Sequence, residues 1–497
     1  MFWLNLSGYW LDNRLLISAS PRGHQTGSMN IWSAVKRIWP IKRAQELVDA
    51  VFEQLRAIRI EQAQLRAVVD QCAHRLDQYS RQLDQCTLDL GRSEDVSGGL
   101  RGLHESIGSV RALLLSEKLS RDEIGYDVVI TPNEINYQHG TGFLVHRLLG
   151  NRGGTLSIRA ANHYGGDHHF GDESLMIAHE GLSRPRSIEQ TLRNLGNRVP
   201  RRIFCVPFLP ADLLTAIALH DVFKAPMCLY LMDDQNITSP AIPDSLMRSF
   251  LERCALRLTT HSEMREAYEK KYGLKFYMLP AVVPHGLISA SISKPEPELV
   301  RERIGALVGS VWGRAWFDQL KTVIGASGLA CHWFGNHKTP VFRITPEELA
   351  EARICAAGVV SEEALAIQLR RFPYAIVPTG TLDEADDTAW ASGLSLPGRI
   401  LFIMATSNTP IIVLGSPRTP AARFIEYFRV GIRCDYTAQS FLAAVDDVVD
   451  PKNQAKMRAN AAHIALRFSA AGIGEWIDRS LELGRPYDSR FEELMPH

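Results

Sequence analysis

The sequence predicts an α/β protein in which two Rossmann-like parallel-sheet domains face a cleft and a helical coiled coil precedes them. Three observations lead to this prediction. Short apolar runs typical of strands alternate with helical stretches from Tyr126 onward, a proline-containing segment interrupts the alternation at 291–300, and a heptad pattern occupies residues 44–90. Strands separated by helices of about ten residues are typical of a parallel sheet covered on both faces.

The length and composition are those of an ordinary globular protein with two or three domains. The chain has 497 residues, 45% hydrophobic and 22% charged, with a formal net charge of zero. This balance gives no electrostatic argument for nucleic acid or an anionic membrane as the main partner. Eight cysteines without a CxxC pair indicate a reducing compartment and no zinc knuckle. We expect no transmembrane helix and no signal peptide.

The heptad pattern at 44–90 predicts a coiled coil within a helical region that spans 38–120, after a flexible segment at 1–37. Two apolar series alternate in steps of three and four with no Gly or Pro, and only Gln62 breaks the seam. We interpret this pattern as a homo-oligomerisation helix. The alternative is an amphipathic helix that packs against the chain's own globular part.

The first α/β domain is expected at 121–295 and the second at 296–497. In the first, strands are expected at 126–131, 156–160, 202–208 and 227–232, and helices at 143–149, 211–223, 245–256 and 263–272. In the second, strands are expected at 303–308, 329–334, 374–377 and 410–414, with helices at 316–324, 361–369 and 399–405 and a helical tail at 451–483. Ligands of such sheets bind beyond the carboxyl ends of the strands.

Several segments from residue 252 onward resemble, in their order, the GT-B fold glycosyltransferases of family 4. The segments are ERCALRLTTHSEMREAYEKKYGLKFYMLPAVVP, RIGALVGSVWGRAWFDQL, CHWFGN, VVSEEALAIQLRRFPYAIVPTG and SLPGRILFIMATSNTPIIVLG. The resemblance covers about residues 126–485. It implies a retaining, metal-independent transferase with a nucleoside-diphosphate sugar as donor substrate and no further cofactor.

A donor diphosphate site is expected where the second domain begins the helix at 399–405. Free backbone N–H groups and the positive end of the helix dipole attract a diphosphate there. The residues concerned are Ser395, Leu396, Pro397, Gly398 and Arg399, with Gly309, Ser310 and Arg314 at the end of the first strand of that domain. The alternative is a plain helix cap with solvated arginines.

Two further strand ends of the second domain, at Gly335-Asn336 and Pro378-Thr379, are expected to hold the nucleotide base and ribose, as the resemblance implies. In the first domain, Gly140, Thr141 and Gly142 precede a helix. The resemblance suggests that they approach the acceptor or the donor phosphate, and we place them on the acceptor side. A tight turn without a ligand is the default explanation for such a short glycine motif.

Asp233 and Asp234 directly follow a buried strand and are the candidate catalytic residues. Such carboxylates can orient an acceptor hydroxyl or stabilise a developing oxocarbenium charge. The alternative for Asp234 is an Asx turn or a helix cap. The histidine-rich segment 163–172 lacks metal-ligand spacing, so we expect a polar loop and no metal site. His261 and Ser262 are expected to cap the following helix; the alternative is that they point into the cleft.

One departure from the family concerns a pair of glutamates that usually lies eight positions apart. Ser395 and Ile403 occupy these positions here. The nearest carboxylates belong to Asp383, Glu384, Asp386 and Asp387, which we interpret as a solvated acidic loop or as displaced substitutes.

The sequence thus predicts a glycosyltransferase that acts on a glycan or lipid-linked glycan hydroxyl, and the resemblance implies a role in bacterial surface polysaccharide synthesis. We expect a cytoplasmic location, with contact to the inner face of the membrane left open, and no nucleic-acid partner. Two alternatives remain: a nucleotide-sugar epimerase of the same fold, and a non-catalytic scaffold that binds glycan or nucleotide and works through its coiled coil.

Overall fold

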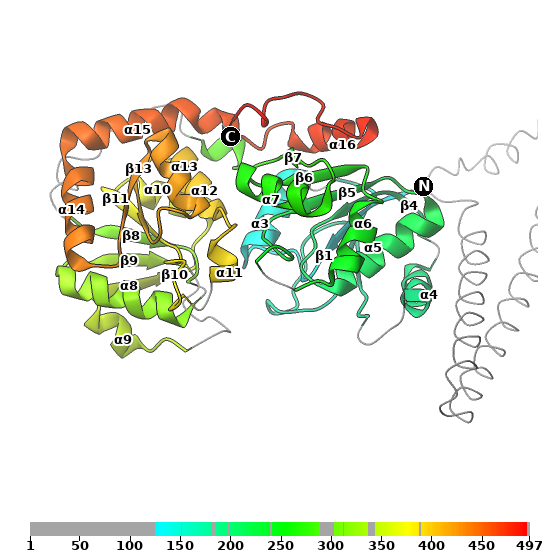
Figure 1. The fold of residues 1–497 in the computed structure, drawn as a ribbon, viewed down its shortest axis with the longest axis horizontal. Helices are drawn as coiled ribbons and strands as arrows, with labels where there is room; N and C mark the ends of the chain where they lie inside the picture. Colours follow the sequence, from blue (N-terminus) through cyan, green and yellow to red (C-terminus); the bar gives the residue numbers. More distant parts are fainter. Residues whose placement is uncertain are drawn as a thin grey trace, which may run out of the picture. The chain divides into compact units, whose positions relative to one another are not determined.

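The computed structural model describes residues 125–150, 152–179, 184–196, 198–238, 241–288, 303–311, 313–335, 343–386 and 389–494. The coiled coil expected at 44–90 and the two segments around it lie outside these ranges. Two parallel sheets with helices on their faces make up the described part (Figure 1). The two Rossmann-like domains expected from the sequence are therefore confirmed.

The first sheet has seven parallel strands in the order β3-β2-β1-β4-β5-β6-β7. Its strands are β1 (Tyr126–Thr131), β2 (Thr155–Arg159), β3 (Glu173–Met176), β4 (Pro200–Cys205), β5 (Met227–Leu231), β6 (Leu256–Thr259) and β7 (Tyr277–Met278). Its helices are α3 (Gly140–Leu149), α4 (Arg184–Leu195), α5 (Pro210–Phe223), α6 (Asp244–Leu251) and α7 (Ser262–Tyr272), with a 3-10 turn η1 (His285–Leu287) after the last strand. The strand order reverses between β1 and β4, which marks the topological switch point of this sheet.

The second sheet has six parallel strands in the order β10-β9-β8-β11-β12-β13. They are β8 (Gly305–Val308), β9 (Cys331–Phe334), β10 (Ile354–Gly358), β11 (Tyr374–Pro378), β12 (Ile411–Leu414) and β13 (Gly431–Cys434). The helices are α8 (Arg314–Ser327), α9 (Pro346–Glu351), α10 (Glu362–Leu369), α11 (Ala389–Ser392), α12 (Gly398–Ser407), α13 (Pro420–Phe428), α14 (Ala438–Val449), α15 (Pro451–Ala465) and α16 (Ile473–Leu483), with a 3-10 turn η2 (Leu466–Phe468) before the last helix. Here the switch point lies between β8 and β11.

Most of the elements expected from apolar runs form where the sequence indicates. The helix expected at 245–256 is an exception, because it ends at Leu251 and its last expected residue begins β6. The tail expected at 451–483 is interrupted by η2 at Leu466–Phe468. Gly273 closes α7 in the left-handed region at φ 68°, as expected of a glycine after a helix.

The chain crosses between the two sheets at two places, and these crossings are hydrogen-bonded to each other. The backbone N–H of Val283 donates to the carbonyl of Phe468, and Ala470 N–H donates to Val283, both at 2.8 Å. Beyond the second crossing, α16 packs against α3 of the first sheet. The C-terminal helix thus belongs to the first domain by contact although it follows the second in sequence.

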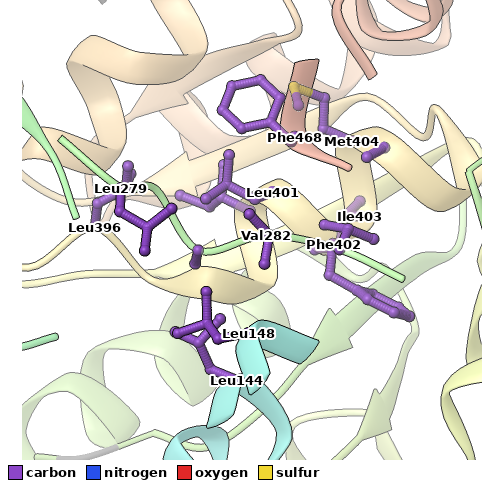
Figure 2. Close-up of a cluster of buried hydrophobic side chains, with 14 of the residues drawn as sticks. Leu144, Leu148, Leu279, Val282, Leu396, Leu401, Phe402, Ile403, Met404 and Phe468 are labelled. Carbon is purple, nitrogen blue, oxygen red and sulfur yellow. The ribbon is translucent and has the colours of Figure 1, made fainter. Parts of the chain in front are cut away.

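Buried side chains around α12 join the first-sheet crossing segment to the second domain. Leu279 and Val282 from the crossing, Leu144 and Leu148 from α3, and the apolar residues of α12 form part of one cluster (Figure 2). Arg147 of α3 adds polar contacts, since it donates to the Val282 carbonyl at 3.1 Å and forms an ion pair with Glu362 of α10. The start of α12 therefore packs against buried apolar side chains.

Candidate functional site

The expected donor residues of the second domain surround its topological switch point. Gly309 and Ser310 follow β8, and Thr379 follows β11, the strand beside it. Helix α12 comes after β11 in the chain and begins at Gly398. The structure therefore brings together three of the segments that the sequence assigned to the donor diphosphate and the nucleotide.

The backbone at Gly309, after β8, lies very close to the backbone at Gly335, after β9. A Cβ atom on Gly335 would lie 2.3 Å from the Gly309 carbonyl oxygen, so no other residue fits. The same oxygen accepts from the Trp333 indole N–H at 2.7 Å. Asn336, which was expected beside Gly335, lies outside the described residues.

Arg399 lies against Gly309, and its guanidinium binds the backbone. One of its terminal nitrogens, Nη1, donates to the carbonyls of Val308 at 2.8 Å and Ser310 at 2.7 Å. Burial lowers the pKa of Arg399 to about 10, so the guanidinium is charged at neutral pH. The arginine places a fixed positive charge between the start of α12 and the end of β8.

The start of α12, where a diphosphate was expected, has no side-chain cap from its N-cap residue. Pro397 occupies the N-cap position, and its own side chain makes no cap hydrogen bond. Leu396 is buried and Gly398 packs against Ala281, so the first turn of α12 packs against the segment that follows β7. The N–H groups at the start of the helix together with its dipole would attract negative charge.

Thr379 is occupied by protein contacts at the end of β11. Its hydroxyl donates to the Leu414 carbonyl at 3.0 Å, and its own carbonyl accepts from the Tyr436 hydroxyl at 2.7 Å. The side chain is 3% exposed. The Thr379 N–H also donates to the Leu414 carbonyl, at 2.8 Å, so Thr379 and the buried Pro378 shape the strand end.

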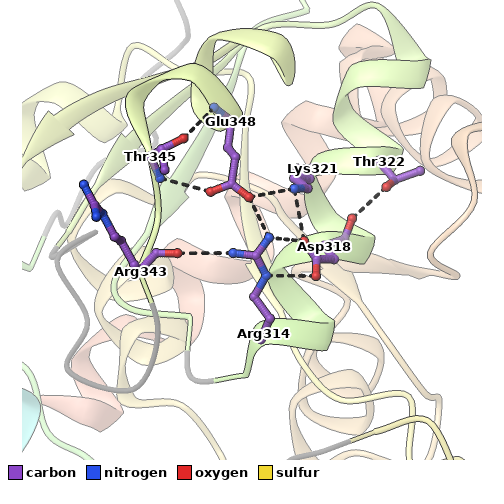
Figure 3. A network of polar contacts seen from close by, with 7 residues as sticks. All are labelled: Arg314, Asp318, Lys321, Thr322, Arg343, Thr345 and Glu348. Carbon is purple, nitrogen blue, oxygen red and sulfur yellow. Dashed lines mark hydrogen bonds and ion pairs between the residues drawn. The ribbon is translucent and has the colours of Figure 1, made fainter.

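Arg314 belongs to a polar network between α8 and α9 (Figure 3). Its guanidinium contacts both carboxylate oxygens of Asp318 at 2.9 Å and Glu348 at 2.6 Å, and Nη1 donates to the carbonyl of Arg343. Lys321 joins the same two carboxylates. These contacts engage each guanidinium nitrogen, so we do not expect Arg314 to bind a phosphate.

Asp233 and Asp234, the two candidate catalytic residues, have different surroundings. Asp234 is 3% exposed and accepts from the backbone N–H groups of Asn236, Ile237 and Thr238 at 2.6–3.0 Å. The Tyr268 hydroxyl donates to it as well, at 3.0 Å. This is the turn-forming role that the sequence left open as the alternative for Asp234.

Asp233 instead contacts the second domain. Its Oδ1 accepts a hydrogen bond from the Ser395 hydroxyl at 3.1 Å, across 162 positions of sequence. Burial raises the pKa of Asp233 and the neighbouring charge of Asp234 acts in the same direction, while the Ser395 hydrogen bond opposes both. A first-domain carboxylate is thus hydrogen-bonded to the segment that leads into α12.

The glycine motif of the first domain is built around a histidine. His139 is the N-cap of α3, and its Nδ1 accepts from the Gly142 N–H at 3.4 Å while Nε2 donates to the Glu134 carbonyl at 2.7 Å. Gly142 is buried against Asn136, whereas Gly140 is exposed and Thr141 is half-buried between them. Gly140 therefore presents an open backbone beyond the end of β1, where an acceptor was expected.

The segment 163–172, expected to be a polar loop, wraps around a buried carboxylate. The backbone N–H groups of His163, Tyr164 and Gly166 donate to Glu134 at 2.5–2.9 Å. Burial would raise the pKa of Glu134, but these backbone hydrogen bonds outweigh it and lower the pKa. Within the described ranges, no group of three or more His, Cys, Asp or Glu side chains is arranged to hold a metal ion.

The two positions where the family carries glutamates are filled differently. Ile403 is fully buried in α12, and Ser395 makes the hydrogen bond to Asp233. In the acidic loop, Asp386 is 9% exposed and accepts from the Trp316 indole at 2.7 Å and the Leu382 N–H at 3.0 Å. The interpretation of this loop as solvated is therefore wrong for Asp386. Asp383 and Glu384 are exposed, and Asp387 lies outside the described residues.

For His261 the sequence favoured a helix cap and left a position facing the cleft as the alternative. It occupies the N-cap position of α7, but its side chain makes no cap hydrogen bond, so the expected capping role is wrong for this side chain. The imidazole is fully buried, with Nδ1 2.9 Å from the Thr260 hydroxyl, and the Leu394 backbone lies beside it. Its position two residues after the last residue of β6, equivalent to that of Asp233 after β5, was the available signal.

Comparison with solved structures identifies the fold. The chain is similar to HepE of Anabaena in complex with UDP, at 12% identity and a TM-score of 0.51, over 72% of this chain and 100% of that one. It is similar to sucrose-phosphate synthase of Thermosynechococcus elongatus, at 11% identity and a TM-score of 0.52, over 72% and 99%. Trehalose-6-phosphate synthase OtsA matches at 9% identity and a TM-score of 0.51, over 72% and 99%.

These similarities give the chain the GT-B fold of glycosyltransferases, as the sequence resemblance implied. No family model matches the chain, and no curated protein matches its sequence. In the part of the chain that the structure describes, every helix is too short or too polar to cross a bilayer.

Proposed function

We propose that the chain is a metal-independent, hexosyltransferase-like enzyme that transfers a sugar from a nucleoside diphosphate to a hydroxyl of a glycan or lipid-linked glycan. The hydrogen bond between Asp233 and Ser395 is the observation that carries this proposal. It brings a first-domain carboxylate to the segment before the open start of α12, so an acid and an anion site lie near each other. The proposal includes a role in bacterial surface polysaccharide synthesis.

The donor diphosphate would lie at the start of α12, near Ser395, Pro397 and Gly398, with the Gly309–Ser310 turn and the Arg399 charge beside it. Helix N–H groups and a fixed cation stabilise the negative charge that grows on a leaving diphosphate. The backbones at Gly335 and Pro378 would border the nucleotide. UDP in HepE is the precedent among the solved structures for a nucleotide bound to this fold.

Transfer breaks the bond between the anomeric carbon and the diphosphate oxygen and forms a bond from that carbon to the acceptor oxygen. The acceptor proton leaves with the diphosphate. Asp233 would orient the acceptor hydroxyl or stabilise the positive charge that develops on the sugar ring. Gly140 and Thr141, at the open start of α3, would border the acceptor.

Nucleotide binding tests the donor half of the proposal. We expect one member of a panel of nucleoside diphosphates and their sugars to raise the melting temperature by several degrees at about 100 times its Kd, where binding adds about 2.7 kcal/mol. Arg399→Lys should reduce this shift. Arg370→Lys is the matched control, because Arg370 donates to the Thr406 carbonyl near the other end of the same helix.

Activity tests the catalytic half. With the donor that binds, Asp233→Asn should lower the turnover number at least a hundredfold and leave the nucleotide-dependent shift in place. Incubation with that donor alone separates the transferase from an epimerase, since only an epimerase yields an isomeric nucleotide sugar. A wild-type chain that shows no shift with any member of the panel would contradict the proposal.

A non-catalytic scaffold is the second candidate, and three observations favour it. Arg399 uses Nη1 for backbone carbonyls, Arg314 is engaged by carboxylates, and Ile403 replaces a glutamate. If the chain is a scaffold, it would work through the coiled coil at 44–90, which we propose as the homo-oligomer interface. We place the protein in the cytoplasm, because the described cysteines are free thiols, as in a reducing compartment. The proposal also includes contact with the inner face of the membrane.

A further inference from the structure

Asp233 and His261 occupy equivalent positions at the ends of two neighbouring strands. Leu231 of β5 is paired with Thr259 of β6, and each side chain of interest lies two residues farther on. Because adjacent parallel strands run about 5 Å apart, side chains just beyond paired residues lie within reach of one ligand. The two groups thus form a potential pair at the carboxyl edge of the first sheet.

The hydrogen-bonding capacity at this edge exceeds what the described chain uses. His261 is fully buried, and its Nε2 forms no hydrogen bond of normal geometry with the described residues, although the Leu394 backbone lies beside the ring. The hydroxyl of Tyr230, near the end of β5, is equally buried and has none in the same ranges. Buried polar atoms without partners are costly and rare, so these two point to a polar ligand.

His261 is a neutral imidazole at physiological pH. Burial lowers its pKa to about 4, with the Arg423 charge adding to the effect and Glu263 opposing it. A neutral imidazole carries one N–H and one acceptor nitrogen. When the Thr260 hydroxyl donates to Nδ1, at 2.9 Å, Nε2 carries the N–H and can donate to an oxygen.

Two consecutive residues of the second domain cover this pair. The Ser395 hydroxyl donates to Asp233, and the Leu394 backbone, whose carbonyl is the group able to accept, lies against His261. The segment therefore offers one O–H donor to the carboxylate and one acceptor oxygen to the imidazole. Two adjacent hydroxyls of a sugar ring offer the same arrangement.

We propose that Asp233 and His261 together bind two neighbouring hydroxyls of the acceptor sugar, and that Leu394 and Ser395 occupy their place in this structure. One sugar hydroxyl donates to Asp233 and the adjacent one accepts from His261 Nε2. The segment is then a competitor built into the chain, which a sugar displaces. This inference rests on the proposed glycosyltransferase function and adds the acceptor chemistry to it.

Saccharide binding to the full chain tests the inference. Methyl glucopyranoside, galactopyranoside and mannopyranoside are titrated in the presence of the nucleoside diphosphate that raises the melting temperature, with binding followed by saturation-transfer NMR. The wild-type chain should bind at least one of them, and a deoxy analogue that lacks one hydroxyl of the pair should bind more weakly.

Three variants define the expected pattern. His261→Phe, which keeps the ring volume, and Asp233→Ala should each weaken binding about tenfold or more, because each leaves a sugar hydroxyl without its partner. Ser395→Ala removes the competing hydroxyl and should strengthen binding about threefold to tenfold. His463→Phe is the control, since His463 is exposed on α15.

The nucleotide-dependent shift in melting temperature is recorded for every variant. It separates the inference about the acceptor from the proposed donor site. Unchanged saccharide binding in His261→Phe, or weaker binding in Ser395→Ala with the nucleotide shift intact, overturns the inference. A wild-type chain that binds the nucleotide but none of the saccharides overturns the inference and leaves the donor site standing. If no nucleotide raises the melting temperature of the wild-type chain, both the inference and the donor site are overturned.

Discussion

Gly140 and Gly142 lie two residues apart at the start of α3, but only one of them requires the absence of a side chain. A Cβ atom on Gly142 would lie 2.0 Å from the Asn136 carbonyl oxygen, whereas a Cβ atom on Gly140 meets nothing within 4 Å. We expect Gly142→Ala to lower the free energy of unfolding by about 2 kcal/mol or more, because backbone must move to admit the methyl group.

Gly140→Ala is the matched control and should be neutral or stabilise slightly, since alanine loses less entropy than glycine on entering a helix. Chemical denaturation of both variants measures the difference. Equal losses in the two variants would contradict the packing at Asn136.

His146 makes the stability of the first domain dependent on pH. Burial, followed by the nearby His168 and His169, lowers its pKa to about 4, and its Nε2 has no partner among the described residues. In the unfolded chain the imidazole takes up a proton near pH 6.5, whereas in the folded chain it does so only near pH 4. The contribution of His146 to stability is therefore complete above pH 6.5 and is lost as the pH falls toward 4.

His146→Phe removes this titration and preserves ring contacts with Tyr137 and Phe170. Between pH 7.5 and 5.0 we expect wild-type stability to fall by about 1–2 kcal/mol more than that of the variant, after allowing for partial solvent exposure. Urea denaturation at the two pH values measures this. Parallel losses would show that His146 does not titrate as proposed.

At the scale of elements, α8 and α9 are joined by the network of Arg314, Asp318, Lys321 and Glu348 (Figure 3). Glu348 also caps α9 with Thr345. We expect Arg314→Gln to lower the free energy of unfolding by about 1 kcal/mol, as for partly exposed ion pairs. It should not change the nucleotide-dependent shift in melting temperature. A lost shift would restore Arg314 to the donor site.

Strands buried on both faces could be predicted from the sequence because they read as continuous apolar runs, as in β1, β5 and β12. The edge strands β3 and β10 are partly exposed and carry no such run, so they were missed. The start of α12 was recognisable from Pro397 and Gly398. The hydrogen bond of Ser395 to Asp233 was not, because it joins segments 162 positions apart.

At the scale of the whole described region, the C-terminal helix returns to the first domain. Asp478 of α16 pairs with Arg152 and Arg202, and Trp476 is 2% exposed (Figure 1). A small cavity lies beneath α16, lined in part by Asp127, Arg202 and Asp478. It lies at the amino ends of the strands, opposite the candidate site.

Trp476→Ala should therefore destabilise the protein by about 3–5 kcal/mol, the usual cost of truncating a buried tryptophan. Leu483→Ala, at an exposed position near the end of the same helix, is the control and should change stability little. Thermal unfolding of both variants distinguishes them. A small loss for Trp476→Ala would contradict the account of α16 as part of the first domain's core.

The central claim is that the start of α12 holds the diphosphate of a nucleotide sugar. A crystal structure of the chain with the nucleoside diphosphate that most raises its melting temperature tests this claim most directly. We predict a β-phosphate hydrogen-bonded to the backbone N–H groups of Gly398 or Arg399, beside Gly309. A nucleotide bound elsewhere on the molecule, with an empty α12 start, would contradict the account.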